Sequence, residues 1–502
     1  MRKSLFVRGA ATAAVAALAL AACGSDGSGD GGGDADGPLT WMATLHTPVT
    51  PDEDGPIQTA LEKHTGEDFE VQWVPAASSA EKLNAALSSG ALADMVSMAP
   101  VDSSTVRQSL TSGMFWDVEP YLKDFPNLAK IDPQTLDAAR LDGKLYGVPF
   151  QKIKARYGVV VRQDWLDNLG LEVPHTIEDL EKVAVAFAKD DPDGNGKDDT
   201  TGFIDREESF DLGFRSLSGY FGAGDDFEVD DAGQVRSTLD GDAFKQAMEW
   251  YRGLYEQGAV NQEFVTMQKT NQQDAIARGK GGIVVTGLFE AKGYLALAQD
   301  ADPKTPMRWA LINDMTYQDV PRRILTDTAG GLGGWLSFPK SEVKDEAELK
   351  RVLGFADKLL DEEAYGLMTN GVEGEHYSVD GDGVVTIEDQ TAWEQEVQPY
   401  SSSRLSEKVV TYKSTEPYVD EGNEKMLENE EYAVVNPAQS LSSEAYDRQW
   451  TTIHDAAKDA YNKYVVGQIE MTDYEAAIEK LRGQGLGDIE QELTAAYAEV
   501  NG

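Results

Sequence analysis

The feature that most constrains the fold is a regular alternation of strand and helix patterns that begins at residue 38. The stretches "PLTWMATLH" (38–46), "FEVQWVP" (69–75) and "DMVSMAP" (94–100) are mostly apolar and predict buried strands. Helical patterns at 55–66 and 78–90 separate them, and each ends at a glycine. Strands joined through single helices favour right-handed crossovers and a mostly parallel sheet. The sequence therefore predicts an α/β fold.

The only cysteine of the chain, Cys23, lies where an apolar run meets a string of glycine and aspartate. A basic start and an apolar run at 10–22, shorter than the about 20 residues that span a bilayer, are typical of an export signal. The sequence Leu20-Ala21-Ala22-Cys23 resembles the bacterial lipoprotein box, which implies a signal peptide at 1–22 and lipidation of Cys23. The alternative is a plain secretory peptide with an incidental cysteine. Residues 23–38 predict a flexible tether.

The charge of the chain excludes several classes of partner. The 88 acidic and 44 basic residues give a net charge of −44, which repels nucleic acid and anionic lipid surfaces. We therefore expect a monomeric body outside the cytoplasmic membrane, anchored to its outer face only through lipid on Cys23.

The run "LDGKLYGVPFQKIKARYGVVVRQDWLDNLG" (141–170) resembles the core signature of bacterial extracellular solute-binding proteins, in the sugar-binding branch that serves ABC importers. The stretches at 250–264, 277–291 and 463–497 agree with that family, although Asn261-Gln262 departs from its usual aspartate-proline. With "GVEGEHYSVDGDG" (371–383), the similarity is greatest to members that handle acidic oligosaccharides, such as aldouronate or alginate fragments.

This resemblance implies a periplasmic-binding-protein-like fold, with two α/β lobes, mostly parallel sheets and hinge crossovers near 150–157 and 324–336. It implies a substrate-binding lipoprotein that captures an oligosaccharide between the lobes and delivers it to the transmembrane subunits of an ABC importer, without catalysis. The alternatives are an exported hydrolase or lyase, or a receptor for peptides or other solutes on the same scaffold. The expected lobes are 39–152 with 325–375 (lobe 1) and 153–324 with 376–502 (lobe 2).

A sugar site needs aromatic plates for the ring faces and polar groups for the hydroxyls. Phe289 is the first candidate, because it ends the strand pattern within 277–291, where the family places a ligand-stacking ring. Trp335, at the glycine-rich second crossing, is the next candidate. For each of them the alternative is a core aromatic residue. Further candidates follow predicted strands: Trp116, Tyr220, Tyr317 and His46.

Basic residues gather at both crossings of this acidic chain. Lys152, Lys154 and Arg156 alternate at the first crossing, and Arg322 and Arg323 precede the second. We expect both groups to converge at the cleft floor and to neutralise a carboxylate-bearing ligand, such as a uronic-acid oligosaccharide. The alternative is that they pair with the protein's own carboxylates.

The loop "DDPDGNGKDDTTGF" (190–203) follows the order of an EF-hand. It predicts a structural calcium ion, but Gly202 stands where a bidentate acid is expected, so Asp198, Asp205 or Glu207 would have to substitute. The alternative is an exposed acidic turn. For the looser match at 378–389 we expect a hairpin. The proposed calcium ligands are Asp191, Asp193, Asn195, the carbonyl of Lys197 and Asp199.

No catalytic signature supports an enzyme. The chain has no H-E-x-x-H, G-x-S-x-G or phosphate-binding G-x-x-x-x-G-K-[ST] pattern. With 88 acids, accidental carboxylate pairs are unavoidable, so a glycosidase cannot be recognised from sequence. No catalytic cofactor is expected.

Overall fold

The alternation at the start of the chain builds the first sheet as predicted. A computed structural model describes residues 37–501 apart from 48, 100 and 102, so the predicted signal peptide, Cys23 and nearly all of the tether lie outside the described residues. β1 (Leu39–Leu45) pairs in parallel with β2 (Phe69–Pro75) and β3 (Met95–Met98). The intervening helices α1 (Pro56–Thr65) and α2 (Ser79–Ser89) end at glycines in the left-handed conformation.

Lobe 1 is built around this sheet, whose order is β2-β1-β3-β12-β4. β12 (Leu332–Ser337) returns from the second crossing and pairs antiparallel with both β3 and β4 (Val148–Gln151), so the sheet is mixed. Besides α1 and α2, the helices of lobe 1 are α3 (Ser104–Ser109), α4 (Glu119–Leu122), α5 (Pro133–Ala139), α12 (Glu346–Lys358), α13 (Glu362–Asn370), α14 (Gln390–Ala392) and α15 (Gln398–Ser402).

Lobe 2 contains the second sheet, ordered β10-β5-β9-β6. Its central strand β5 carries a continuous valine run whose alternate residues face two separate cores, Val159 and Val161 on one side and Val160 on the other. The strands are β5 (Tyr157–Arg162), β6 (Thr201–Phe203), β9 (Gly281–Gly287) and β10 (Trp309–Ile312), and only β6 and β9 pair in parallel.

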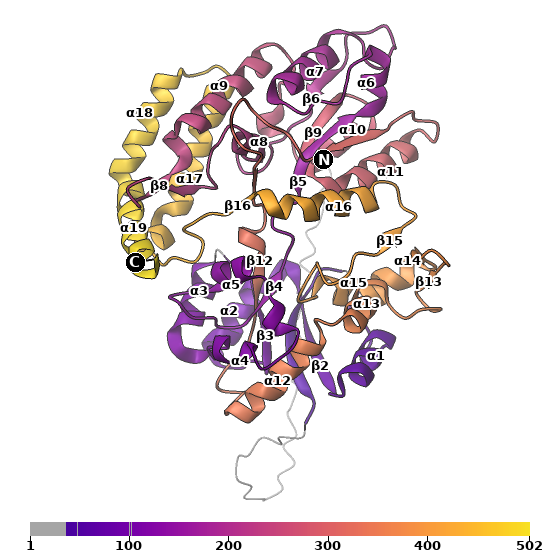
Figure 1. The fold of residues 1–502 in the computed structure, drawn as a ribbon, viewed down its shortest axis with the longest axis vertical. Coiled ribbons are helices and arrows are strands. Elements are labelled where there is room, and N and C mark those ends of the chain that lie inside the picture. Colours follow the sequence, from indigo (N-terminus) through magenta and orange to yellow (C-terminus); the bar gives the residue numbers. More distant parts are fainter. Residues whose placement is uncertain (1–36, 48, 100, 102, 502) are drawn as a thin grey trace, which may run out of the picture. The chain divides into compact units, whose positions relative to one another are not determined.

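Helices enclose both faces of this sheet, and the closing helices α17, α18 and α19 lie side by side (Figure 1). Thr176 caps α7 as expected, accepting a hydrogen bond from the backbone N–H of Asp179. The helices of lobe 2 are α6 (Gln163–Leu169), α7 (Ile177–Lys189), α8 (Gly213–Tyr220), α9 (Asp242–Glu256), α10 (Lys269–Ala277), α11 (Ala291–Ala301), α16 (Val419–Asn429), α17 (Glu444–Val465), α18 (Met471–Leu481) and α19 (Gly487–Asn501).

Three small sheets complete the fold. The segment at 378–389 forms the expected hairpin, in which β13 pairs antiparallel with β14. The short strands are β7 (Phe227–Val229) with β8 (Val235–Ser237), β11 (Ile324–Leu325) with β16 (Ala433–Val434), and β13 (Tyr377–Val379) with β14 (Val384–Ile387) and β15 (Lys413–Ser414). Among residues 37–501, as far as they are described, no helix has the length and apolarity to cross a membrane.

The chain passes between the lobes at residues 152–156 and 326–331, where crossovers were expected, and again after α15. The predicted return to lobe 2 at residue 376 is too early, because Val397, Tyr400 and Leu405 are buried in the core of lobe 1. The Tyr400 ring lies 5.3 Å from that of Trp73 on β2. Lobe 1 therefore continues to about residue 405, and the third crossing is residues 406–418.

Candidate functional site

A cavity of about 770 Å³, the first cavity, lies between the lobes at the carboxyl end of β3. Lobe 1 contributes the segment after β3, from Ala99 to Arg107, and the second crossing contributes Asp327 to Gly333. Lobe 2 contributes α17 and the segment before it. A cavity beyond the carboxyl end of a parallel strand is where α/β proteins usually bind ligands.

One wall of the first cavity is an aromatic ladder on α17. Tyr446, Trp450 and His454 are spaced by four residues, so they share one face of the helix. The Tyr446 and Trp450 ring centroids are 5.4 Å apart with planes 16° apart, and the His454 ring lies 5.6 Å from Trp450. Such a row of partly exposed ring faces can stack against successive sugar rings.

The other walls of the first cavity carry charged groups, three carboxylates (Asp226, Asp327 and Asp447) and one guanidinium (Arg107). Arg107 donates to the backbone carbonyls of Gln439 at 3.3 Å and Leu441 at 2.9 Å, and so connects α3 to the segment before α17. Carboxylates accept hydrogen bonds from hydroxyl groups, so this lining suits a neutral, hydroxyl-rich ligand.

Asp225, next in the chain to the cavity-lining Asp226, is a buried carboxylate between Arg215 and Thr326. The Thr326 hydroxyl donates to its Oδ2 at 2.7 Å. Burial raises the pKa of Asp225 to about 6, although the Arg215 guanidinium opposes that shift.

An ion pair between the first and second crossings separates this cavity from another. Arg156 donates from its backbone N–H to Oδ1 of Asp327 at 2.7 Å and from Nε to Oδ2 at 2.8 Å. The Asp327 side chain is only 4% exposed, and burial raises its pKa despite the adjacent guanidinium. Asp327 lines the first cavity, whereas Arg156 lines the second.

The second cavity, of about 810 Å³, is enclosed by α13, the β14 hairpin, the third crossing and the α11 and α16 regions of lobe 2. Four aromatic residues line it: Phe289, Tyr365, Trp393 and Tyr412. Its cationic residues outnumber its carboxylates, in contrast to the first cavity.

The predicted aromatic plates divide into exposed and buried residues. Phe289 is 42% exposed and lines the second cavity, so its ring is accessible to a ligand, as the prediction requires. Trp335 and Tyr220 are 0% and 2% exposed, so the prediction that their rings stack on a ligand is wrong. Trp335 points into the core of lobe 1, where its indole N–H donates to the carbonyl of Ala139 at 2.8 Å. Tyr220 packs in the main core of lobe 2.

The remaining ring candidates lie outside the linings of both cavities. Trp116 packs against the core of lobe 1 and donates from its indole to the carbonyl of Val343 at 2.7 Å. Tyr317 packs on Phe221 with ring centroids 4.4 Å apart. His46 is exposed after β1, and partial burial together with the charge of Lys152 lowers its pKa.

The basic residues at the crossings pair with the protein's own carboxylates, which was the alternative interpretation. Lys152 pairs with Glu407 at 2.8 Å and Lys154 with Asp132 at 2.9 Å, so only Arg156 of this group lines a cavity. Residues 152–156 are not a strand, so these side chains do not share one face as predicted.

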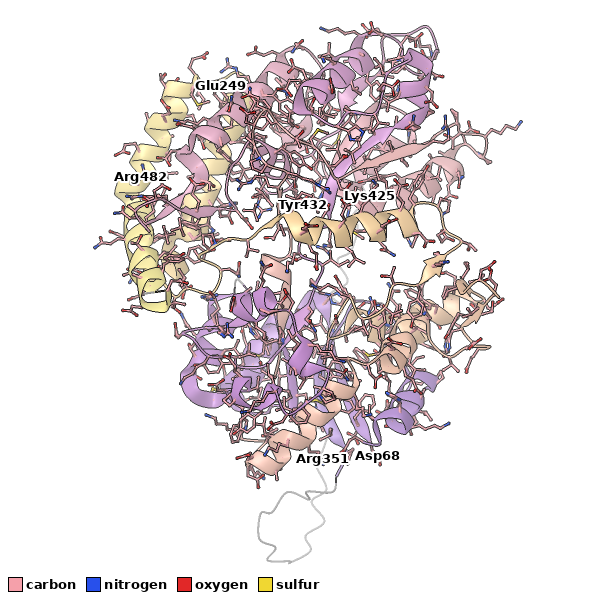
Figure 2. All side chains as sticks on the ribbon, in the orientation of Figure 1. Asp68, Glu249, Arg351, Lys425, Tyr432 and Arg482 are labelled. Carbon is pink, nitrogen blue, oxygen red and sulfur yellow. The ribbon has the colours of Figure 1, made fainter. Side chains whose placement is uncertain are left out.

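The second basic group also fails to reach the cavities. Arg322 pairs with Glu428 at 2.7 Å, and its guanidinium lies 4.0 Å from the ring centre of Tyr432, which Figure 2 labels. Arg323 donates to the carbonyl of Ala223 at 3.0 Å, and burial lowers its pKa.

The EF-hand-like loop brings together the oxygens that calcium requires. Asn195 donates from Nδ2 to Asp193 at 2.7 Å and to Asp199 at 3.1 Å, so these three side chains converge. Oδ1 of Asp191 is buried with no donor, an acceptor that a cation would satisfy. Asp191, Lys197 and Asp198 border a cavity of about 230 Å³ there. The donor set therefore fits a calcium ion, although Lys280 pairs with Asp199 at 2.9 Å.

Asp205 cannot supply the missing acid of this loop. It is buried, and Ser209 and Tyr251 donate hydrogen bonds to it inside the core of lobe 2. Of the suggested substitutes, Asp198 is the one that borders the small cavity beside the loop.

A histidine and two glutamates form a second candidate metal site, but the tautomer of the histidine argues against metal binding there. In the described part of the chain, Glu375, His376 and Glu396 alone place three such ligand atoms within 4.8 Å of one another. The backbone N–H of Val372 donates to Nδ1 of His376, so the imidazole proton lies on Nε2, which points at Glu396 at 3.2 Å. A metal ion at Nε2 would need an imidazolate.

Sequence reasoning missed the residues that most define the two cavities. The α17 ladder was detectable in "YDRQWTTIH" (446–454), where aromatic rings recur at helical spacing. Arg107, Arg404 and Asn370 carry no such signal, because only the tertiary fold brings them to a cavity wall.

Known proteins resemble this chain over nearly its whole length. Residues 57–349 match a family described as bacterial extracellular solute-binding protein. The polygalacturonan/rhamnogalacturonan-binding protein YtcQ of Bacillus subtilis is 34% identical over 464 residues, 92% of this chain and 91% of that protein. Lipoprotein LipO of the same organism is 31% identical over 468 residues, 91% of each chain. The crystal structure of an extracellular solute-binding protein from Bifidobacterium longum subsp. infantis matches with a TM-score of 0.70 at 18% identity, covering 92% of this chain and 99% of the other.

Proposed function

Because the chain belongs to the family of bacterial extracellular solute-binding proteins, we propose that it captures an oligosaccharide in the first cavity and delivers it to the transmembrane subunits of an ABC importer. It is a binding protein and not an enzyme. The observation that carries the proposal is the aromatic ladder of α17, which lines the first cavity together with Arg107 of lobe 1. Closure of the lobes over the sugar would then mark the loaded state for the importer.

The chemistry of the first cavity favours neutral sugar units on the ladder. Stacking that buries about 100 Å² of apolar surface contributes about 2.5 kcal/mol per ring. Hydroxyl groups can donate to the three carboxylates at about 0.5–1.5 kcal/mol each. Micromolar binding corresponds to a binding free energy of about 8 kcal/mol. Two or three stacked rings with several hydrogen bonds supply this, even after the entropy lost on association is subtracted. The name of YtcQ gives polygalacturonan and rhamnogalacturonan as ligands of that protein, and the rhamnose units of rhamnogalacturonan are neutral.

Calorimetric titration of Trp450→Ala with a neutral oligosaccharide, such as galactotetraose, tests this proposal. Loss of the central ring should weaken binding at least tenfold, whereas Trp116→Phe, which changes an indole outside both cavities, should bind like the parent. The recovered oligosaccharide should be uncut. Unchanged affinity in the Trp450 variant would contradict the site.

We further propose that the loop at Asp191–Asp199 holds a structural calcium ion. Carboxylates of Asp191, Asp193 and Asp199, the amide oxygen of Asn195 and the carbonyl of Lys197 would hold it, with Asp198 nearby. The ion would stabilise the end of α7 and the start of β6 and would take no part in sugar chemistry.

The start of the chain bears on where the protein works. We propose that Cys23 carries lipid, that the export signal before it is removed, and that the monomeric body works on the outer face of the membrane. The lipoprotein LipO supports this by its similarity. Replacing Cys23 by serine should move the protein from the membrane fraction into the medium, and continued membrane retention would contradict lipid anchoring.

A further inference from the structure

The second cavity has a charge opposite to that of the chain around it. Two carboxylates, Glu407 and Glu416, face four cationic side chains there, although acids outnumber bases two to one in the whole sequence. The first cavity has the opposite excess, with three carboxylates against one arginine. The cations of the second cavity are Arg156, Lys292, Arg404 and Lys413.

Within the described residues, three of these four cations form no ion pair with a carboxylate. Only Arg156 has one, Asp327, among the ion pairs of the described residues. Arg404 donates from Nε to the carbonyl of Ser401 at 2.9 Å and from Nη1 to the Thr369 hydroxyl at 2.6 Å. These two neutral acceptors hold the guanidinium in place, 5.0 Å from the ring centre of Tyr365, without neutralising its charge.

A buried donor in the same wall also lacks a partner. Asn370, the last residue of α13, is 5% exposed and lines the cavity, and its Nδ2 has no acceptor within the described structure. An unsatisfied buried amide destabilises the fold, so the retention of Asn370 at this wall points to a ligand oxygen that accepts from it.

Aromatic faces lie beside these donors. Phe289 is 42% exposed, with the Arg156 guanidinium 5.7 Å from its ring centre. The rings of Tyr365 and Tyr412 are stacked 6.2 Å apart with planes 12° apart. Ring faces next to surplus donors suit a molecule with flat apolar faces and many oxygens, some of them charged.

We propose that the second cavity is a separate binding site for a carboxylate-bearing saccharide, such as an oligogalacturonate. Arg404, Lys292 and Lys413 bind its carboxylates, Asn370 donates to a ring or hydroxyl oxygen, and Phe289 stacks on a pyranose face. The site goes beyond the proposed capture of sugar on α17, because it lies on the other side of the Arg156–Asp327 pair and shares no lining residue with the first cavity. A saccharide there would contact α13 of lobe 1 and α11 of lobe 2 at once.

Calorimetric titration of the full mature chain with trigalacturonate tests the proposal. The variant Lys292→Gln/Lys413→Gln should bind it at least tenfold more weakly, since both lysines are exposed and their loss should not disturb folding. The control Lys304→Gln/Lys344→Gln removes two exposed lysines outside both cavities, with the same change in net charge, and should bind like the parent. Arg404→Gln should repeat the tenfold loss.

Two further comparisons separate this site from the capture site and from other acids. Trp450→Ala should retain trigalacturonate binding at the second cavity, even though it loses sugar stacking in the first. The fully methyl-esterified trigalacturonate, with the same rings and no charge, and triglutamate, with charge and no rings, should each bind at least tenfold more weakly. Equal affinity for either of them, or unchanged affinity in the lysine pair, would overturn the proposal.

Discussion

Nε of Arg156 lies 2.8 Å from Oδ2 of Asp327, and the two residues line different cavities. The pair joins the first crossing to the second and lies between the two cavities. We call this Arg156–Asp327 pair the partition. A second hydrogen bond, from the Arg156 backbone to Asp327, fixes the two segments in register. The partition explains how one acidic chain can keep an acidic cavity and a basic cavity side by side along its crossings.

Breaking the partition should destabilise the fold. Arg156→Gln leaves the Asp327 carboxylate, 4% exposed, without its cation. We expect the free energy of unfolding to fall by about 1–3 kcal/mol, below the range for a fully buried pair because Arg156 is 29% exposed. Urea unfolding measures this. Lys182→Gln, which removes the exposed pair with Asp179, should leave the free energy of unfolding nearly unchanged, because solvent screens that pair. Equal losses in both variants would contradict a structural role for the partition.

Asp225 should make stability depend on pH. Its pKa of about 6 exceeds the ordinary 3.8, so the folded chain binds this proton more readily than the unfolded chain. The contribution of Asp225 to unfolding free energy should therefore rise as pH falls through about 6, and should be lost as pH rises through that value. Asp225→Asn should remove this part of the slope. Unfolding of both proteins at pH 4.5 and 7.5 measures it, and the advantage of the asparagine variant should be larger at pH 7.5. Parallel pH profiles would refute the assignment.

A glycine of β12, just after the second crossing, should resist substitution. Gly334 has a φ of 128°, and a Cβ there would lie 2.5 Å from the carbonyl oxygen of Met98. Gly334→Ala should lower the free energy of unfolding by about 1–3 kcal/mol or more, because strain and a backbone clash combine. The matched control, Gly253→Ala in α9, meets open space and should stabilise by about 0.5–1 kcal/mol. Thermal unfolding compares them, and similar midpoints would be inconsistent with this geometry.

Calcium should stabilise the folded chain through the Asp191–Asp199 loop. At a calcium concentration 100 times the dissociation constant, binding to the folded state alone adds about 2.7 kcal/mol. Differential scanning calorimetry with calcium and with chelator should show the higher midpoint in calcium. Asp193→Asn/Asp199→Asn should lose the difference, whereas Asp380→Asn/Asp382→Asn in the β13–β14 hairpin should keep it. A shift that survives in the loop variant would exclude this site.

The sequence by itself determined the elements and the family. The apolar strands at 39–45, 69–75 and 95–98 and the glycines after α1 and α2 are local signals, because periodicity and the left-handed freedom of glycine act over a few residues. The signature at 141–170 and the Thr176 cap likewise needed no partner from elsewhere in the chain.

The tertiary structure decided which side chains face a ligand. Trp335 and Phe289 both lie in glycine-rich strand patterns of the sequence. Trp335 lies within β12 and enters the core, whereas Phe289 lies in the turn after β9 and reaches a cavity, a difference that the sequence pattern does not show. The cations at the crossings were visible in sequence, but their partners Glu407, Asp132 and Asp327 lie far along the chain. Packing between distant segments fixes burial and charge pairing. Within the described residues it left Arg404 bonded only to neutral acceptors, and it left Nδ2 of Asn370 without an acceptor, both at a cavity wall.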